Sequence, residues 1–224
     1  MIIDFHAHIL PGVDHGSASL ENSIKQLSAA KLAGIEVVVA TSHFYPDKNE
    51  MESFLEKRSD AYEILKPSLK QFEITCILGA EVALCEGLEN LKDLQKLCIE
   101  GTPYMLLEMP FRHITDRLVN TVVAIQEMGI KPILAHINRY SIKNVWRLLE
   151  LGVLAQLNVE AFAGFRNRHK YISYIDKGMI HVLGSDSHID RMESYPQFAK
   201  ALKKLGQSRV ENLMQQAAEL LNLS

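Results

Sequence analysis

The chain has 224 residues, of which 47% are hydrophobic and 23% charged, and its formal net charge at pH 7 is −3. This length and mixed composition predict one domain, residues 1–224, with a substantial core, and they exclude an intrinsically disordered chain. Without an apolar run near the roughly 20 residues that cross a bilayer, a leader-like start or a long basic run, we expect a cytoplasmic protein that does not insert into membranes or bind nucleic acid.

Short apolar runs typical of strands alternate with longer amphipathic runs typical of helices. In chain order, strands are predicted within 1–5, 36–42, 74–82, 104–110, 131–137, 153–159 and 181–186. The first helix is predicted between Ser19, which is placed to cap it, and Gly34, which ends it. Between these two, apolar residues follow a helical spacing at Leu20, Ile24, Leu27 and Leu32. Later helices are predicted within 144–152 and 171–178, and two more within 195–224.

This alternation predicts an α/β fold in which helices cover a parallel sheet. About seven strand-helix units favour closure into a small barrel related to the TIM barrel. An open, doubly wound sheet is the alternative.

Side chains that bind metals recur where the predicted strands end: His6 and His8, His43, Glu81, Glu108, His136, then Asp186 with His188. The carboxyl ends of parallel strands in a barrel lie on one face, so we expect these distant residues to converge there. His6 and His8 share one side of an extended segment, because alternate residues of a strand point the same way. Asp14, in the loop after His8, is a further candidate.

Histidine nitrogens mixed with carboxylate oxygens suit zinc, manganese or iron better than calcium. So many ligands predict two or three ions that share carboxylates, an arrangement able to activate water and hold a phosphate. Simpler interpretations stay open for single residues. Asp186 could cap a helix, His136 could be a satisfied core histidine, and Asp4, on the face of His6, either supports the site or is a solvated acid.

The cysteines predict neither a disulfide framework nor a thiolate zinc site. Cys76, Cys85 and Cys98 are odd in number and lack Cys-x-x-Cys spacing. A cysteine-dependent tyrosine phosphatase needs an arginine six positions after its cysteine, and these three are followed there by valine, leucine and tyrosine. That mechanism is excluded.

Seven segments together carry a resemblance to a known family: "DFHAHILPGVDHGS", "GIEVVVATSHF", "GAEV", "LLEMPF", "ILAHINRY", "LAQLN" and "LGSDSH". They resemble the PHP (polymerase and histidinol phosphatase) superfamily, and within it the bacterial capsule-biosynthesis tyrosine-protein phosphatases of the CpsB/CapC kind. The resemblance spans nearly the whole chain. It implies a distorted (β/α)7 barrel of PHP type and metal ligands at His6, His8, Asp14, His43, Glu81, Glu108, His136, Asp186 and His188.

The resemblance also implies an activity. It points to a trinuclear site commonly served by manganese, with iron or zinc as alternatives. The expected reaction is hydrolysis of phosphotyrosine on a protein partner, a bacterial tyrosine autokinase that controls capsular or exopolysaccharide assembly. Arg139 and Arg191, each three residues after a candidate histidine ligand, would bind the phosphate. The simpler alternative is that they are surface-loop arginines.

The chain departs from the family pattern beside its candidate ligands. It has Asp14-His15-Gly16 where the family has D-D-G, Thr41-Ser42-His43-Phe44 for T-P-H-H, and His136-Ile137-Asn138-Arg139-Tyr140 for H-P-E-R-Y. These changes alter local charge and the expected pocket wall, so they bear on the substrate more than on the metals. Two other functions stay open: another PHP-type or amidohydrolase-like metallohydrolase of a small phosphoester, and a non-catalytic barrel in the polysaccharide assembly complex.

Overall fold

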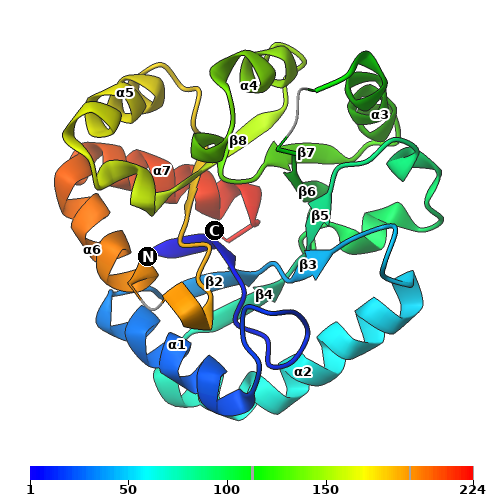
Figure 1. Ribbon diagram of the computed structural model, residues 1–224. Coiled ribbons are helices and arrows are strands. Elements are labelled where there is room, and N and C mark those ends of the chain that lie inside the picture. Colours follow the sequence, from blue (N-terminus) through cyan, green and yellow to red (C-terminus); the bar gives the residue numbers. More distant parts are fainter. Residues whose placement is uncertain (112–113, 192, 224) are drawn as a thin grey trace.

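The computed structural model describes residues 1–111, 114–191 and 193–223 as an α/β fold with helices around a curled parallel sheet (Figure 1). The strands form two sheets, ordered β1-β2-β4 and β3-β5-β6-β7-β8-β9, and every described strand pairing is parallel. Their bounds are β1 (Ile3–Ala7), β2 (Val37–Ala40), β3 (His43–Phe44), β4 (Thr75–Leu78), β5 (Glu81–Ala83), β6 (Tyr104–Glu108), β7 (Lys131–Leu134), β8 (Leu154–Asn158) and β9 (Val182–Gly184).

The last strand returns to the first, so the sheet curls into a barrel-like wall. Ala7 forms a parallel bridge with Ser187 just beyond β9. The amide of His8 donates to the carbonyl of Ser187 at 3.0 Å, and the amide of Asp186 donates to the carbonyl of His6 at 2.7 Å. The predicted barrel-like α/β fold is therefore confirmed, and the open sheet is not observed. Residues far apart in sequence become neighbours at this junction.

The prediction of one strand over 74–82 was wrong, because this segment forms β4 and β5 in different sheets. Two adjacent segments change sheets together. The register of β2 with β4 ends at Ala40 and Leu78, and a new register begins where His43 of β3 pairs with Glu81 of β5. Glu81 therefore starts a strand instead of ending one. This change of sheet makes His43 and Glu81 direct neighbours on adjacent strands.

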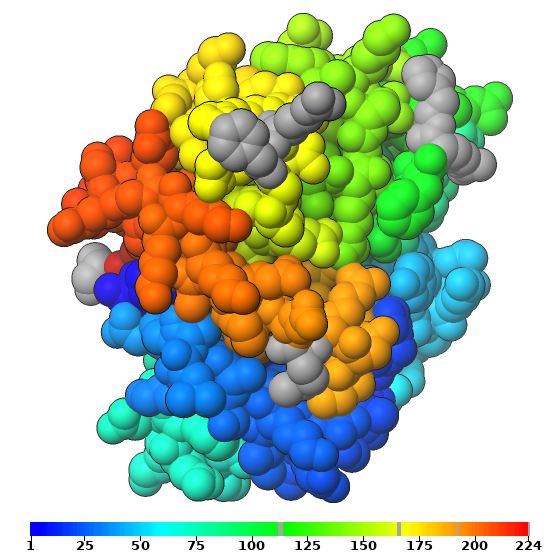
Figure 2. Space-filling view, turned by 60° about the vertical axis from the view of Figure 1, so that its left-hand side comes forward, coloured from blue at the N-terminus to red at the C-terminus, as the bar shows by residue number. Residues whose placement is uncertain are grey.

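Helices cover the outside of the wall. They are α1 (Leu20–Leu32), α2 (Met51–Phe72), α3 (Asp116–Glu127), α4 (Ile142–Leu149), α5 (Phe165–Asp176), α6 (Ser194–Leu205) and α7 (Gln207–Leu220). Figure 2 shows the orange segment at the start of α6 between the yellow segment of α5 and the blue segment of α1. The helical shell thus continues across the junction of the chain's beginning and end. Within the described residues, no helix has the length and apolar character needed to cross a membrane.

The first helix begins as predicted, since the Ser19 side chain accepts a hydrogen bond from the amide of Asn22. Its buried face differs from the predicted apolar spacing. Of the four apolar residues only Leu27 is buried, and Leu32 is 87% exposed. The inward positions are instead Ser23, Gln26, Leu27 and Ala30. A polar residue occupies this face because Gln26 donates hydrogen bonds to the backbone carbonyls of His8 and Ser187.

Candidate metal centre

The predicted ligands of the first and last strands meet at one buried carboxylate. Nε2 of His6 and Nε2 of His8 lie 3.0 Å apart, and each lies 3.2 Å from Oε2 of Glu81. Oδ1 of Asp186 lies 3.6 Å from His6 Nε2 and 3.3 Å from His8 Nε2. All four residues are buried. Their donor atoms fall within 4.8 Å of one another, which is close enough for one metal ion to bridge them.

Glu81 also faces a histidine on the neighbouring strand β3 and another just after β7. Nδ1 of His43 lies 3.0 Å from Glu81 Oε2, and Nε2 of His136 lies 2.7 Å from Glu81 Oε1. Glu108, at the end of β6, approaches His136 Nε2 to 3.8 Å. His43, Glu81 and Glu108 form a second group of donors within 4.8 Å. The two oxygens of Glu81 therefore face different partners, as expected of a carboxylate shared between ions.

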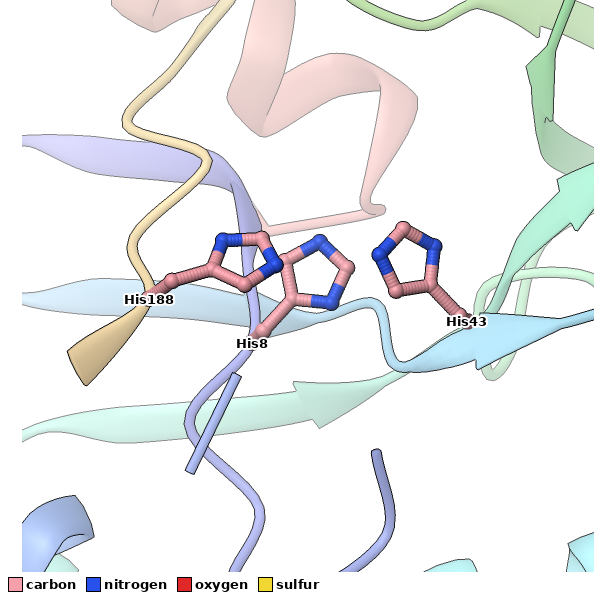
Figure 3. Close-up of side chains that lie close together, drawn as sticks. All are labelled: His8, His43 and His188. Carbon is pink, nitrogen blue, oxygen red and sulfur yellow. The ribbon is translucent and has the colours of Figure 1, made fainter. Parts of the chain in front are cut away.

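A third group consists of imidazoles. Figure 3 shows the rings of His8, His43 and His188 side by side, each on a different segment of the chain. The ring centroids of His43 and His188 lie 4.3 and 4.2 Å from that of His8. Asp14 lies beside this group, with Oδ2 2.8 Å from His8 Nδ1 and accepting the His43 amide at 2.8 Å. All nine predicted ligands thus gather in one place.

Local backbone geometry holds these side chains close together. His136 and Asp186 adopt left-handed conformations, with φ of 32° and 49°, which non-glycine residues seldom adopt. Glycine permits two close approaches. A Cβ at Gly16 would lie 2.1 Å from Cβ of His8, and one at Gly184 would lie 2.6 Å from Cβ of His6. These two glycines let the loop after His8 and the end of β9 pack directly against the segment that carries His6 and His8.

Electrostatics among the protein groups favour the charged forms of Glu81 and Asp186 but not that of Glu108. Burial opposes ionisation of Glu81, but His6 and hydrogen bonds from His136 and His43 outweigh it and hold the pKa of Glu81 well below its usual value. Burial likewise opposes ionisation of Asp186, and His8 lowers its pKa in spite of this. Burial raises the pKa of Glu108, and the charge of Glu81 adds to the shift.

The donor set fits a polynuclear metal centre. Asp14, Glu81, Glu108 and Asp186 bring four carboxylates to a site lined by imidazoles, and two divalent cations would balance that charge. Nε2 of His188 is buried and has no hydrogen-bond partner among the described residues. A buried imidazole nitrogen without a partner is unfavourable unless a cation or water satisfies it. Nitrogen and oxygen donors without thiolate suit manganese, iron or zinc.

Both predicted arginines reach this face, and both contact Asp186. Nη2 of Arg139 donates to Asp186 Oδ2, and Nη1 of Arg191 lies 3.3 Å from the same oxygen. Asn158 donates to it as well, at 3.2 Å. Oδ1 of Asp186 faces the two histidines while Oδ2 faces the arginines. Asp186 does not cap a helix; it separates the imidazole side of the centre from a cationic side.

Two polar residues that were not predicted from the sequence, Gln156 and Gln26, support the centre. Gln156, on β8, accepts the amide of His136 at 2.6 Å and lies 3.1 Å from Nδ1 of His6, while its own amide donates to Asn158. Gln26 donates to the carbonyls of His8 and Ser187. The available signal was the pair of polar residues two positions apart inside the apolar strand "LAQLN".

Asp4 proves to be a structural acid of the strand junction. It is fully buried, its carboxylate accepts hydrogen bonds from the amide and hydroxyl of Ser185, and it also accepts the amide of His6. Of the two interpretations left open for Asp4, support for the site applies and a solvated acid does not. The contact ties β1 to the loop that carries Asp186.

The three departures from the family pattern differ in consequence. His15 lies over the imidazole group, with its ring centroid 4.8 Å from those of His43 and His188. Phe44 points into the core, where its ring packs edge-on against Phe54 at 5.1 Å, so the expectation that it changes the pocket wall was wrong. Alternation along the short strand β3 explains this, because neighbours in a strand face opposite sides. The side chain of Asn138 donates to Glu160 and accepts the amide of Asn158.

Comparison with known proteins places the chain among capsule-synthesis proteins. A family model described as "Capsular polysaccharide synthesis, CpsB/CapC" matches residues 2–222. The tyrosine-protein phosphatase CpsB of Streptococcus pneumoniae is 28% identical, over 95% of this chain and 94% of that protein. The tyrosine-protein phosphatase YwqE of Bacillus subtilis (strain 168) is 29% identical, over 98% of this chain and 91% of that protein.

Solved structures support the fold. A chain from the crystal structures of YwqE from Bacillus subtilis and CpsB from Streptococcus pneumoniae, described as unique metal-dependent tyrosine phosphatases, matches with a TM-score of 0.81 and 24% identity. It covers all of this chain and 95% of its own. A TatD-like protein from Archaeoglobus fulgidus has a TM-score of 0.59 at 13% identity, covering 98% of this chain and 99% of its own. At 24% and 13% identity, both matches support the assignment of the fold alone.

Proposed function

Because the chain belongs to the CpsB/CapC family of capsular polysaccharide synthesis proteins, we propose that it is a metal-dependent phosphatase that removes phosphate from tyrosine side chains of a protein partner. The partner we propose is a bacterial tyrosine autokinase that controls polysaccharide assembly. We also propose that the protein acts in the cytoplasm and that residues 1–224 form a single domain. The curated relatives CpsB and YwqE, which it matches along nearly their whole length, are tyrosine-protein phosphatases.

One observation carries the proposal: nine separate ligand-type residues gather around the shared carboxylate of Glu81, beside two arginines. The proposed ligands are His6, His8, Asp14, His43, Glu81, Glu108, His136, Asp186 and His188, and the proposed ions are two or three Mn²⁺, with iron or zinc as alternatives. Bound metal ions would supply an activated water and charge stabilisation for in-line displacement at phosphorus. Nitrogen and oxygen donors support this assignment, because such sets suit these metals.

Arg139 and Arg191 are the residues proposed to touch the substrate. Both guanidinium groups lie at the cationic side of Asp186, adjacent to the imidazole cluster. A guanidinium donates two parallel hydrogen bonds to phosphate oxygens and is charged at every physiological pH. The pair is thus suited to orient the phosphate and to stabilise the negative charge that builds on it during transfer.

The cysteines support a mechanism that does not use a thiolate. Burial raises the pKa of Cys76 to about 12 and that of Cys98 to about 11, so both are protonated at neutral pH. Burial also raises the pKa of Cys85. A thiol nucleophile needs the opposite shift. The proposed chemistry therefore rests on metal-activated water.

Metal analysis combined with turnover tests the proposal. The purified protein should hold two or more metal equivalents and hydrolyse a phosphotyrosine peptide. Chelation should abolish turnover and Mn²⁺ should restore it, while thiol alkylation should change it little. Asp186→Ala should lose both metal and turnover. Full turnover in protein shown to be metal-free would reject the metal mechanism, and metal-loaded protein inactive on every phosphoester would favour the non-catalytic alternative.

A further inference from the structure

Aromatic rings from two neighbouring loops connect the protein surface to the proposed metal centre. Phe111 lies three residues after Glu108, beyond the carboxyl end of β6, and Tyr140 lies in the segment after β7. The ring centroids of Phe111 and Tyr140 are 5.6 Å apart, and that of Tyr140 is 5.5 Å from His136. Ring pairs in proteins commonly lie 4.5–7 Å apart. The two loops therefore place a continuous aromatic path beside a candidate ligand.

Phe111 is the outermost ring of this path and is 74% exposed. Two apolar residues close to it in sequence, Met109 and Ile114, are buried. An exposed apolar residue is common on protein surfaces and by itself indicates nothing. Phe111 is notable for its position, because its ring contacts Tyr140, which in turn contacts a candidate ligand of the centre.

Tyr45, which also lies near the centre, is already engaged by other groups. Its ring stacks on His43 with centroids 5.3 Å apart, and Nζ of Lys48 lies 4.9 Å from it. Such a stacked and cation-covered ring has less surface to offer a ligand. Phe111 retains most of its surface for a further aromatic partner.

We propose that Phe111, held by Tyr140, is the surface on which the aromatic ring of the substrate stacks while its phosphate occupies the metal centre. The inference rests on the proposed phosphatase function and specifies an aryl phosphoester over an alkyl one. In an aryl phosphate one oxygen joins the ring to phosphorus, so the ring must lie close to the metal-bound phosphate. A serine or threonine phosphate has no ring to occupy this position.

The test compares aryl with alkyl ligands in wild-type protein and in Phe111 variants. We would measure kcat/KM for phenyl phosphate and ethyl phosphate, and calorimetric binding of phenylphosphonate and methylphosphonate to the metal-loaded protein. The two substrates differ in leaving group, but this difference cancels when their ratio is compared between variants. Because stacked rings contribute modestly beyond their buried area, Phe111→Ala should lower both aryl-to-alkyl ratios roughly five- to tenfold.

Two further variants and a control sharpen the result. Phe111→Trp should keep the aryl preference, and Phe111→Leu should keep only part of it, because leucine is apolar without a ring. Leu32→Ala, which truncates an exposed apolar residue on α1, should leave both ratios unchanged. Equal ratios in wild-type protein and Phe111→Ala would overturn the inference. Failure of the phosphatase function would appear differently, as no turnover of either phosphoester, and the phosphonate ratios would then still decide whether Phe111 binds an aryl ring.

Discussion

Replacing Arg139 by alanine tests whether the cationic side of the centre binds phosphate. The Arg139 side chain is 22% exposed and donates to Asp186 Oδ2, the oxygen that faces away from the imidazoles. If this guanidinium stabilises charge on the transferred phosphoryl group, its loss should cost about 3 kcal/mol, or about a hundredfold in kcat/KM. Arg139→Lys should restore only part of the rate, because an ammonium group lacks the bidentate fork.

The same contacts predict what Arg139→Ala should leave intact. Oδ1 of Asp186 faces His6 and His8, whereas the hydrogen bond from Arg139 goes to Oδ2, which keeps its hydrogen bond from Asn158 in the variant. Metal content should therefore stay near that of wild-type protein. Arg191 is 48% exposed and lies farther from Asp186, so Arg191→Ala should lose about tenfold, less than Arg139→Ala.

The assay is steady-state kinetics on an aryl phosphate and on a phosphotyrosine peptide, with metal content measured on the same samples. Arg209→Ala is the matched control, because Arg209 forms a two-point ion pair with Asp176 on the surface, at 2.6 and 2.9 Å. An exposed ion pair of this kind contributes little to stability, and this one lies away from the proposed centre, so its loss should not change turnover. Wild-type rates in metal-replete Arg139→Ala would refute the assignment of Arg139 to phosphate. Loss of metal together with rate would show that Arg139 acts through Asp186.

Three further predictions concern metal binding and stability. Glu81→Ala should lose metal and turnover together, since its two oxygens face different histidines, and normal metal content by elemental analysis would contradict this geometry. Gln156→Leu should weaken metal binding about 10- to 100-fold, because Gln156 orients His6 and the backbone of His136; a competition titration with a metal indicator would measure it. Burial raises the pKa of Asp4 to about 6. The folded state therefore binds this proton more tightly than the unfolded state, and the stabilisation is fully present below about pH 4 and lost as the pH rises through 6. The free energy of unfolding should fall by about 3 kcal/mol across this range. Thermal unfolding measured at several pH values should show this fall in the wild-type protein and not in Asp4→Asn.

The chain alone determined the fold class and the identity of the candidate ligands. Strand and helix patterns repeat with a spacing that only a parallel α/β arrangement satisfies, and His, Asp and Glu recur where strands end. Because parallel strands direct their carboxyl ends to one face, chain order was enough to predict that His6, Glu108 and Asp186 would meet. Ser19 could also be identified as a helix cap from the sequence, because capping depends only on residues close in sequence.

Tertiary packing alone decided which polar groups share a partner. The break between β4 and β5 depends on pairing with two different strands, which no local pattern encodes. Likewise, Gln26 on α1 and Gln156 on β8 became supports of the centre only when the curled sheet brought them to its loops. The inward face of α1 carries Gln26 because its side chain donates to the backbone carbonyl of His8, and a buried carbonyl left unpaired is costly. Local sequence determines the elements and their chemistry, whereas hydrogen-bond partners depend on contacts between residues far apart in the chain.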